Sequence, residues 1–265
     1  MAGALLGQET NGVIDIHSGG EDNIFPHHEC EIAQSCGVSG EEYFARYWFH
    51  TRHLMVEGEK MSKSKGNFYS LEDLTRRGAS PAAVRLELIR SHYRSNANFT
   101  FQGLKDSQRQ IERWARLKSW LSRHQDAPTP EPAPMEQALE VFRKQLCSDL
   151  NIAGAIGALN EAISQYDVSQ APTGNASSSS TLAGELAAFE AMDSVLGILD
   201  LEIEAGATGG DVDPALIGAK IAEREEARAN KDWDAADRIR DELLEMNIEI
   251  KDSPEGTTWK RVVGS

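Results

Sequence analysis

The chain has 265 residues, a length that suits one large domain or two or three small ones with a buried core. Its 42 acidic and 27 basic side chains give a net charge of −15, which over the whole chain argues against a polyanionic partner. No apolar run approaches the roughly 20 residues of a membrane helix, and no secretory signal is recognisable. The three cysteines, Cys30, Cys36 and Cys147, form no disulfide framework, so we expect a reducing, cytoplasmic setting.

The charge is distributed unevenly along the chain. Residues 52–124 hold 15 lysines and arginines against 7 aspartates and glutamates, a net of +8, whereas the rest holds 12 against 35, a net of −23. Affinity for a nucleic acid depends on the contacts that release counterions, so an acidic chain can bind RNA through a local basic face. We expect this basic segment, residues 52–124, to contact phosphate groups.

The first elements predict the edge of an α/β sheet. Val13–His17 is typical of a short buried strand that stops at Gly19–Gly20, and a helix is expected over Pro26–Ser35. Ligands of open α/β sheets collect at such strand ends. The capping-box spacing of Ser39–Glu42 predicts another helix, through Tyr43–Phe49.

His27 and Glu31 stand at i and i+4 on the first predicted helix, so they share one face. That spacing can present an imidazole nitrogen and a carboxylate oxygen to one metal ion. It is also the spacing of an ordinary pair on a helix surface. The residues alone leave both interpretations open.

The octapeptide Lys60–Asn67, KMSKSKGN, puts three lysines, two hydroxyls and a glycine on one short loop. Ammonium groups supply point charge to a polyphosphate, while serine and glycine let the backbone approach the anion. The loop lacks the frame of a Walker motif. A solvated surface turn is the alternative.

A largely helical region follows the loop. Leu104, Ile111, Trp114, Leu117 and Leu121 form one apolar stripe, which we interpret as packing rather than as a ligand site. The absence of strand-like alternation beyond it predicts a helical bundle. The expected helices cover 70–78, 82–93, 104–124, 135–166 and 181–203, and the expected linkers cover 126–134, 171–181 and 205–213, of which 171–181 is predicted to be a mobile loop.

The last 50 residues predict a small α+β module. Pro214 begins a helix that runs to about Asn230, Asp232 caps a second, and Asn247 can end it in a left-handed conformation. Residues 248–250 and 257–260 are predicted to form a hairpin across a turn at 253–256. A module of this size is expected to depend on packing against a neighbouring domain for its stability.

Several segments resemble the cysteinyl-tRNA synthetases, a family of class I aminoacyl-tRNA synthetases. KMSKSKGN is similar to the class I signature loop, and the other matching segments are DIHSGGED (15–22), FPHHECEIAQS (25–35), WDAADRIRD (233–241) and GTTWKR (256–261). The resemblance covers nearly the whole chain. It departs from the family pattern at Ser18, where a glycine is usual, and at Cys30, where an asparagine is usual.

The resemblance implies an α/β remnant of a class I Rossmann-type catalytic domain over 1–97. A mostly α-helical bundle that contacts tRNA stems is implied over 98–203, and a small α+β anticodon-binding module over 214–265. The family's HIGH-type motif does not occur in this sequence, and Met1 aligns with the end of the family's WHIECSAM segment. We therefore expect a chain that begins just past a zinc-ligating cysteine, whether through an internal start codon or as a fragment.

The resemblance also implies the site residues, with ATP, cysteine and cysteine tRNA as partners of a monomer. His17, Lys60 and Lys63 would be catalytic, and a zinc ion that binds the substrate thiolate would take His27 and Glu31, two of its four family ligands. Residues near the nucleotide would be Gly19, Gly20, Asp22, Lys60, Met61, Ser62, Lys63 and Ser64. Residues that read tRNA would be Arg238, Arg240, Asp241 and Trp259.

The implied activity is ATP-dependent formation of cysteinyl-adenylate and transfer of cysteine to its tRNA. Because half of the ATP site is not in this sequence, a non-catalytic tRNA-binding fragment is a second hypothesis. A cysteine ligase of mycothiol synthesis is a third, against which the predicted anticodon module argues. The alternative for His17 is a buried structural histidine, and the alternative for Trp259 is the core of its small module.

Overall fold

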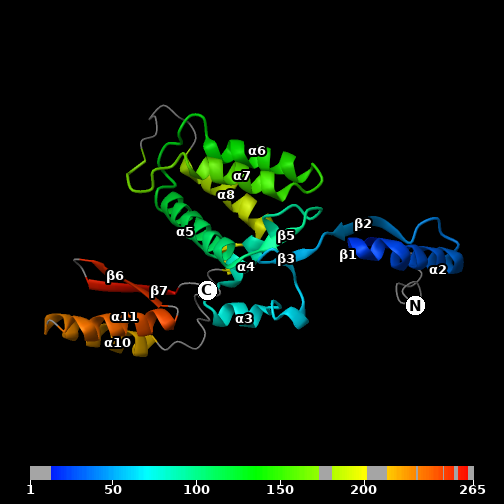
Figure 1. The fold of residues 1–265 in the computed structure, drawn as a ribbon. Coiled ribbons are helices and arrows are strands. Elements are labelled where there is room, and N and C mark those ends of the chain that lie inside the picture. The colour runs from blue at the N-terminus through cyan, green and yellow to red at the C-terminus, as the bar shows by residue number, and fades with distance from the viewer. Residues whose placement is uncertain are drawn as a thin grey trace. The chain divides into compact units, whose positions relative to one another are not determined.

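The computed structural model describes residues 13–172, 181–201, 214–230, 232–246, 248–253 and 256–261. They divide into two compact units, which we describe separately. One comprises the described residues up to Asn67 together with Ser91–Phe99, and the other comprises Phe68–Arg90 and the described residues from Thr100 onward (Figure 1). The domain boundaries inferred from the sequence stay predictions.

A parallel pair of strands forms the first part of unit one. β1 and β2 pair in register, with His17 opposite Trp48 and Gly20 opposite Thr51. Gly40, at φ 75°, ends the intervening helix, as glycine readily does. The elements in chain order are β1 (Ile14–Gly20), the short turns η1 (Glu21–Asn23) and η2 (Ile24–His28), α2 (Glu29–Ser39) and β2 (Ala45–Thr51).

The helix predicted over Tyr43–Phe49 is wrong, because residues 45–49 lie in β2 and the two residues before them are not helical. Ser39 does not cap a new helix. It is the last residue of α2, and its hydroxyl accepts a hydrogen bond from the Glu41 amide (3.2 Å). The aromatic run favours a half-buried pleated surface, and pairing with β1 supplies the backbone hydrogen bonds that decide the outcome.

A second sheet in this unit carries the KMSKSKGN loop. Its strand order is β4-β3-β5, where β3 (Leu54–Val56) is antiparallel to β4 (Glu59–Lys60) and parallel to β5 (Ala97–Phe99). Glu57 and Gly58, at φ 50° and 78°, make the two-residue turn of the β3–β4 hairpin. Lys60 therefore ends β4, and the loop begins at the sheet edge, with a short turn η3 (Lys63–Lys65) inside it.

The second unit begins with helices whose caps the sequence indicates. Ser70 and Asp73 form a capping box at the start of α3, and the Ser80 hydroxyl caps α4 by accepting from the Ala83 amide. The helices are α3 (Leu71–Arg76), α4 (Pro81–Ile89), α5 (Phe101–Arg123), α6 (Pro134–Leu146), α7 (Ile152–Ile163) and α8 (Leu182–Leu196).

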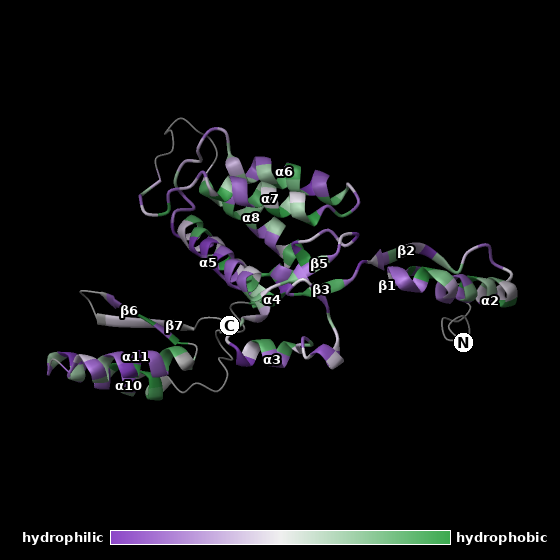
Figure 2. Cartoon of the chain, in the orientation of Figure 1, coloured by the Kyte–Doolittle hydropathy of each residue, from purple (hydrophilic) through white to green (hydrophobic). Residues whose placement is uncertain are grey.

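The apolar stripe of α5 packs in the core of the bundle, as predicted. All five stripe residues are buried, and Trp114 also donates a hydrogen bond from Nε1 to Asn160 Oδ1 on α7 (2.9 Å). Figure 2 shows both hydrophilic and hydrophobic residues on α5, as expected of an amphipathic helix. From α6 and α8, Phe142 and Phe189 complete the buried centre.

The helix expected over 135–166 is two helices. Asp149 and Leu150 both adopt positive φ (53° and 54°), which breaks α6 from α7. Asn151 then caps α7, since its side chain accepts from the Gly154 amide (3.1 Å). No helix among the described residues is long and apolar enough to cross a membrane.

The C-terminal module has the predicted two helices and hairpin. Its core gathers Ile217, Ile221, Ile239, Leu243 and Ile248. The elements are α10 (Pro214–Ala229), α11 (Trp233–Glu245), β6 (Ile248–Ser253) and β7 (Gly256–Arg261), and Asp232 caps α11. Asn247, the linker 205–213 and most of the loop predicted over 171–181 lie outside the described residues.

Candidate functional site

Four histidines and one carboxylate meet where β1 ends. His17 Nε2 lies 2.9 Å from Glu31 Oε2, and His27 Nε2 lies 3.5 Å from Glu31 Oε1. His28 Nδ1 lies 2.8 Å from His50 Nε2. β1 supplies His17, the turn η2 supplies His27 and His28, α2 supplies Glu31, and β2 supplies His50. The pairing of β1 with β2 therefore brings the group together.

His28 is the buried member of this group, and Gly19 makes room for it. The imidazole is 4% exposed. Burial, then the neighbouring His17 and His50, lower the pKa of His28 below its usual value, so that the ring is neutral near pH 7. A Cβ at Gly19 would lie 2.9 Å from His28 Cε1, closer than packing allows. Gly19 is thus required by a neighbouring side chain, a reason that the sequence did not reveal.

These donors suit a metal ion of zinc's preferences. His17, His28 and Glu31 each offer one ligand atom, and the three atoms lie within 4.8 Å of one another. Glu31 Oε2 is buried and lies 2.9 Å from His17 Nε2, so the carboxylate and this imidazole already face one another. Neutral imidazole and carboxylate are zinc ligands. The pair matched by sequence, His27 and Glu31, lies at the same place, although the His27 side chain is 64% exposed.

Three of the residues predicted to meet the nucleotide, Gly19, Gly20 and Asp22, lie at the end of β1 or just after it. Gly20 lies against the Asp22 carboxylate, and a Cβ at this position would collide with that group. Ser18, the departure from the family pattern, is exposed on β1. The segment therefore bends tightly into η1.

A hollow of about 240 Å³ opens beside this strand end. Arg52 crosses it to Glu21, with Nε 3.0 Å from Oε2. The Tyr93 ring stacks on Phe49 at 4.3 Å between centroids. Sequence reasoning missed these residues, although an alternating Trp-x-His-x-Arg run is a strand signal that could have found three of them. The hollow is lined by Glu21, Ile24, Trp48, His50, Arg52, Tyr93 and Arg94.

The KMSKSKGN loop is held as a compact turn by its last residue. Asn67 Oδ1 accepts from the Ser62 amide (2.8 Å), and its Nδ2 donates to the Lys60 carbonyl (3.2 Å). Gly66, at φ 70°, permits the reversal. Lys65 pairs with Glu59 at 3.0 Å, while Lys60 and Lys63 are exposed. Within the loop, Met61 and Ser62 are half-buried, and the Ser62 and Ser64 hydroxyls are 2.8 Å apart.

The four residues predicted to read tRNA divide between two elements of the C-terminal module. Arg238, Arg240 and Asp241 are exposed on α11, where Arg240 lies 3.3 Å from Asp237 and 3.4 Å from Asp241. Trp259, on β7, is 42% exposed and does not belong to the module's core. The interpretation of Trp259 as core is therefore wrong, because isoleucine and leucine fill that core.

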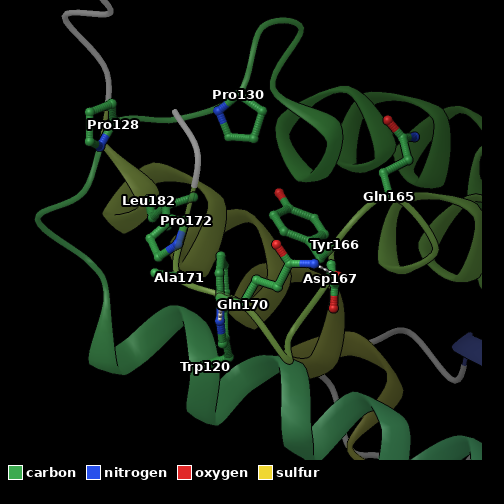
Figure 3. Close-up of a pocket in the computed structure, with 10 residues that line it drawn as sticks. All are labelled: Trp120, Pro128, Pro130, Gln165, Tyr166, Asp167, Gln170, Ala171, Pro172 and Leu182. Carbon is green, nitrogen blue, oxygen red and sulfur yellow. Dashed lines mark hydrogen bonds between the residues drawn. The ribbon is translucent and has the colours of Figure 1, made fainter. Parts of the chain in front are cut away.

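A separate hollow of about 200 Å³ lies in the helical bundle (Figure 3). Trp120 forms one wall and donates from Nε1 to the Gln170 carbonyl (3.0 Å), while Tyr166 faces it from the chain after α7. The Tyr166 hydroxyl donates to the buried Glu185 carboxylate, which also accepts from the Met135 amide (2.8 Å). Burial and this contact raise the pKa of Tyr166 well above its usual value. These bonds tie α6 to α8.

Comparison with known proteins identifies the family of this chain. The class I (C) catalytic domain of tRNA synthetases matches residues 1–109, and the cysteinyl-tRNA ligase anticodon binding domain matches residues 215–259. This chain belongs to the cysteinyl-tRNA synthetase family. The resemblance read from its motifs is confirmed, and the family is one of ligases.

The curated relatives are about twice as long as this chain. Cysteine–tRNA ligase of Brachyspira hyodysenteriae is 39% identical over 255 residues, which are 93% of this chain and 52% of that protein. Cysteine–tRNA ligase of Afipia carboxidovorans is 40% identical over 260 residues, 98% of this chain and 51% of that protein. The chain thus spans about half the length of the relatives that it matches.

A solved structure supports the fold. The LeuRS of Agrobacterium radiobacter K84, in a ternary complex with tRNA and LeuAMS, superposes with a TM-score of 0.53 and 15% identity. The match covers 75% of this chain and 28% of that one. The fold class predicted from sequence, a class I synthetase catalytic fragment followed by helices and a small C-terminal module, is confirmed.

Proposed function

We propose that this chain supplies the part of a cysteine–tRNA ligase that contributes the KMSKS loop, the metal-binding end of β1 and the anticodon module. The reaction joins the cysteine carboxylate to the α-phosphorus of ATP, releases pyrophosphate and then transfers cysteine to the tRNA 3′ end. The observation that carries the proposal is the grouping of His17, His27 and Glu31 at a strand end, in a chain that also has the loop.

Each predicted residue has a role that its position supports. Lys60 and Lys63, exposed on a loop folded by Asn67, would stabilise charge that grows on the pyrophosphate. Gly19, Gly20 and Asp22 would lie near the adenosine, and Met61, Ser62 and Ser64 would shape the loop around the phosphates.

The metal would select the amino acid. His27 and Glu31 would hold a zinc ion whose chemistry is to bind a thiolate in preference to a protonated hydroxyl. His17 Nε2, 2.9 Å from Glu31 Oε2, keeps that carboxylate facing the site. A site of this kind separates cysteine from serine without editing.

The anticodon module supports the tRNA ligase over a mycothiol-pathway ligase. Trp259, on β7, offers a half-exposed ring for stacking a base, and Arg238 and Arg240, on α11, offer exposed guanidinium groups. Asp241 would accept from a base edge. The match of residues 215–259 to an anticodon-binding family agrees with this assignment.

A hybrid ligase tests the proposal. The N-terminal part of the Brachyspira hyodysenteriae relative is fused to this chain, and cysteine-dependent pyrophosphate exchange and charging of cysteine tRNA are measured. We expect both activities in the hybrid and background exchange by this chain alone. A folded hybrid without exchange, but with tRNA binding, would instead favour the non-catalytic tRNA-binding fragment.

A further inference from the structure

Arg77, which ends α3 in the second unit, stacks on two aromatic rings. Its Cζ lies 5.1 Å from the ring centroid of Tyr69 and 5.1 Å from that of Phe101, and the two rings meet edge to face at 5.3 Å. Among the described residues this guanidinium has no carboxylate partner, whereas the neighbouring Arg76 pairs with Glu72. Ring faces therefore hold Arg77 and leave the N–H groups at its edge for another partner.

The helix α5 extends the positive charge from its first residue, Phe101. Lys105, Arg109, Arg113 and Arg116 follow Phe101 at spacings of four, four, four and three residues, so all five lie on one side of the helix. The row is about 22 Å long at a rise of 1.5 Å per residue. It lies away from the buried apolar stripe, and its three arginines are exposed.

Acidic side chains are few in this part of the second unit. Residues 68–90 and 100–124 hold ten lysines and arginines against five aspartates and glutamates, although the whole chain has a net charge of −15. Arg109 pairs with Asp106 at 3.0 Å. Arg113 and Arg116 make no ion pair with any residue that the structure describes. Exposed, unpaired arginines in a rigid row suit a polyanion whose charges are regularly spaced along a backbone, which is the chemistry of a nucleic acid.

We propose that Arg77, Arg113 and Arg116 bind phosphates along the backbone of a tRNA stem, independently of the anticodon. Tyr69 and Phe101 are positioning residues, which hold the planar guanidinium of Arg77 in one orientation so that less freedom is lost on binding. Phosphate contacts position an RNA without reading its sequence. This surface therefore adds the same affinity for every tRNA. The inference rests on the proposed function for the identity of the RNA, but it requires no ligase activity.

The salt dependence of tRNA binding by this chain tests the surface. Affinity is measured over a range of salt concentrations for cysteine tRNA and for the same tRNA with its anticodon replaced. Arg77→Gln should weaken binding of both tRNAs by the same factor and reduce the slope of log K against log salt by about 0.7–0.9, since one phosphate contact is lost. The double variant Arg113→Gln/Arg116→Gln should reduce the slope by about twice that amount.

Arg76→Gln is the matched control for the lost charge. Arg76 is adjacent to Arg77 in sequence, its side chain is 71% exposed, and Glu72 already neutralises it. Its replacement should leave the salt slope unchanged. Tyr69→Leu keeps every charge and should weaken tRNA binding about 3-fold or more, whereas Tyr69→Phe, which keeps a ring under the guanidinium, should bind like the natural chain. Equal binding by the two Tyr69 variants would overturn the positioning role.

Circular dichroism reports whether each variant keeps its helices, and the double variant changes only exposed side chains. The proposal is overturned if Arg77→Gln and the double variant, both folded, keep the original salt slope. It is also overturned if polyglutamate, an acidic peptide, competes for the surface as well as duplex RNA does. If Arg77→Gln lowers the salt slope but the natural chain binds both tRNAs equally, only the anticodon-reading part of the proposed function fails.

Discussion

The ion pair between Arg224 and Asp252 gives the sharpest prediction for the C-terminal module. Arg224 is only 11% exposed and donates from both terminal nitrogens to the Asp252 oxygens, at 2.9 and 3.0 Å. Arg228 and Thr257 add contacts at 2.8 and 2.9 Å. Arg224 Nε has no further partner and is buried. Asp252 therefore fastens α10 to the hairpin.

Asp252→Ala should destabilise the module by about 2–3 kcal/mol. Breaking a buried pair and leaving one charge uncompensated costs about 3–5 kcal/mol, and the 40% exposure of the Asp252 side chain lets water recover part of that cost. Hydrogen exchange of the β6 and β7 amides in the full chain should accelerate about 30- to 150-fold.

Asp241→Ala is the matched control for this measurement. Its pair with Arg240 is long, at 3.4 Å, and both side chains are more than half exposed. Its loss should cost less than about 0.5 kcal/mol. Equal exchange rates in the Asp252 and Asp241 variants would refute the reasoning, since they would show that burial of Arg224 carries no free-energy consequence.

The same pair makes the module sensitive to acid. The hydrogen bond from Arg224, helped by Thr257, holds the pKa of Asp252 well below its usual range. A carboxyl whose pKa is lowered by folding contributes stability that is present above its unfolded pKa of about 3.9 and is lost as the pH falls toward the folded value. Hairpin protection should therefore decline below about pH 4 in the natural chain and change less in Asp252→Ala.

Three further substitutions test other parts of the account. Gly19→Ala should destabilise the first unit by about 1–3 kcal/mol, because its methyl group would overlap His28; thermal melts check this, and an unchanged melt contradicts it. Trp114→Phe should cost about 2–3 kcal/mol in denaturant titrations, since it leaves Asn160 Oδ1 without its donor and opens a void. Lys63→Ala in the hybrid should slow pyrophosphate exchange about 100-fold or more with the melting temperature unchanged, whereas full exchange would remove Lys63 from the ATP site.

Local signals predicted the helices well. Asp232 caps α11 as predicted, and Ser70 and Ser80 cap the helices expected over 70–78 and 82–93, because an N-cap depends on its own next few residues. The α5 stripe was equally readable from its spacing. The break at 149–150 was not, since two non-glycine residues adopt positive φ there. Asn151, a good cap, was the available hint.

The sequence predicted only those contacts of the site that join residues a few positions apart. The i,i+4 spacing of His27 and Glu31 identified a donor pair. The approach of His17 to Glu31 and of His50 to His28 depends on the parallel pairing of β1 with β2. That pairing was hidden by the incorrect helix over 43–49, because local capping chemistry at Ser39 was given more weight than the aromatic character of the segment that follows.

The affinity of this chain for cysteine tRNA tests the central claim most directly. The claim is that residues 214–261 read an anticodon, with Trp259 as a stacking platform. Binding should be at least about 10-fold tighter for cysteine tRNA than for the same tRNA with its anticodon replaced, and Trp259→Ala should abolish that preference. Equal affinity for both tRNAs would contradict the account.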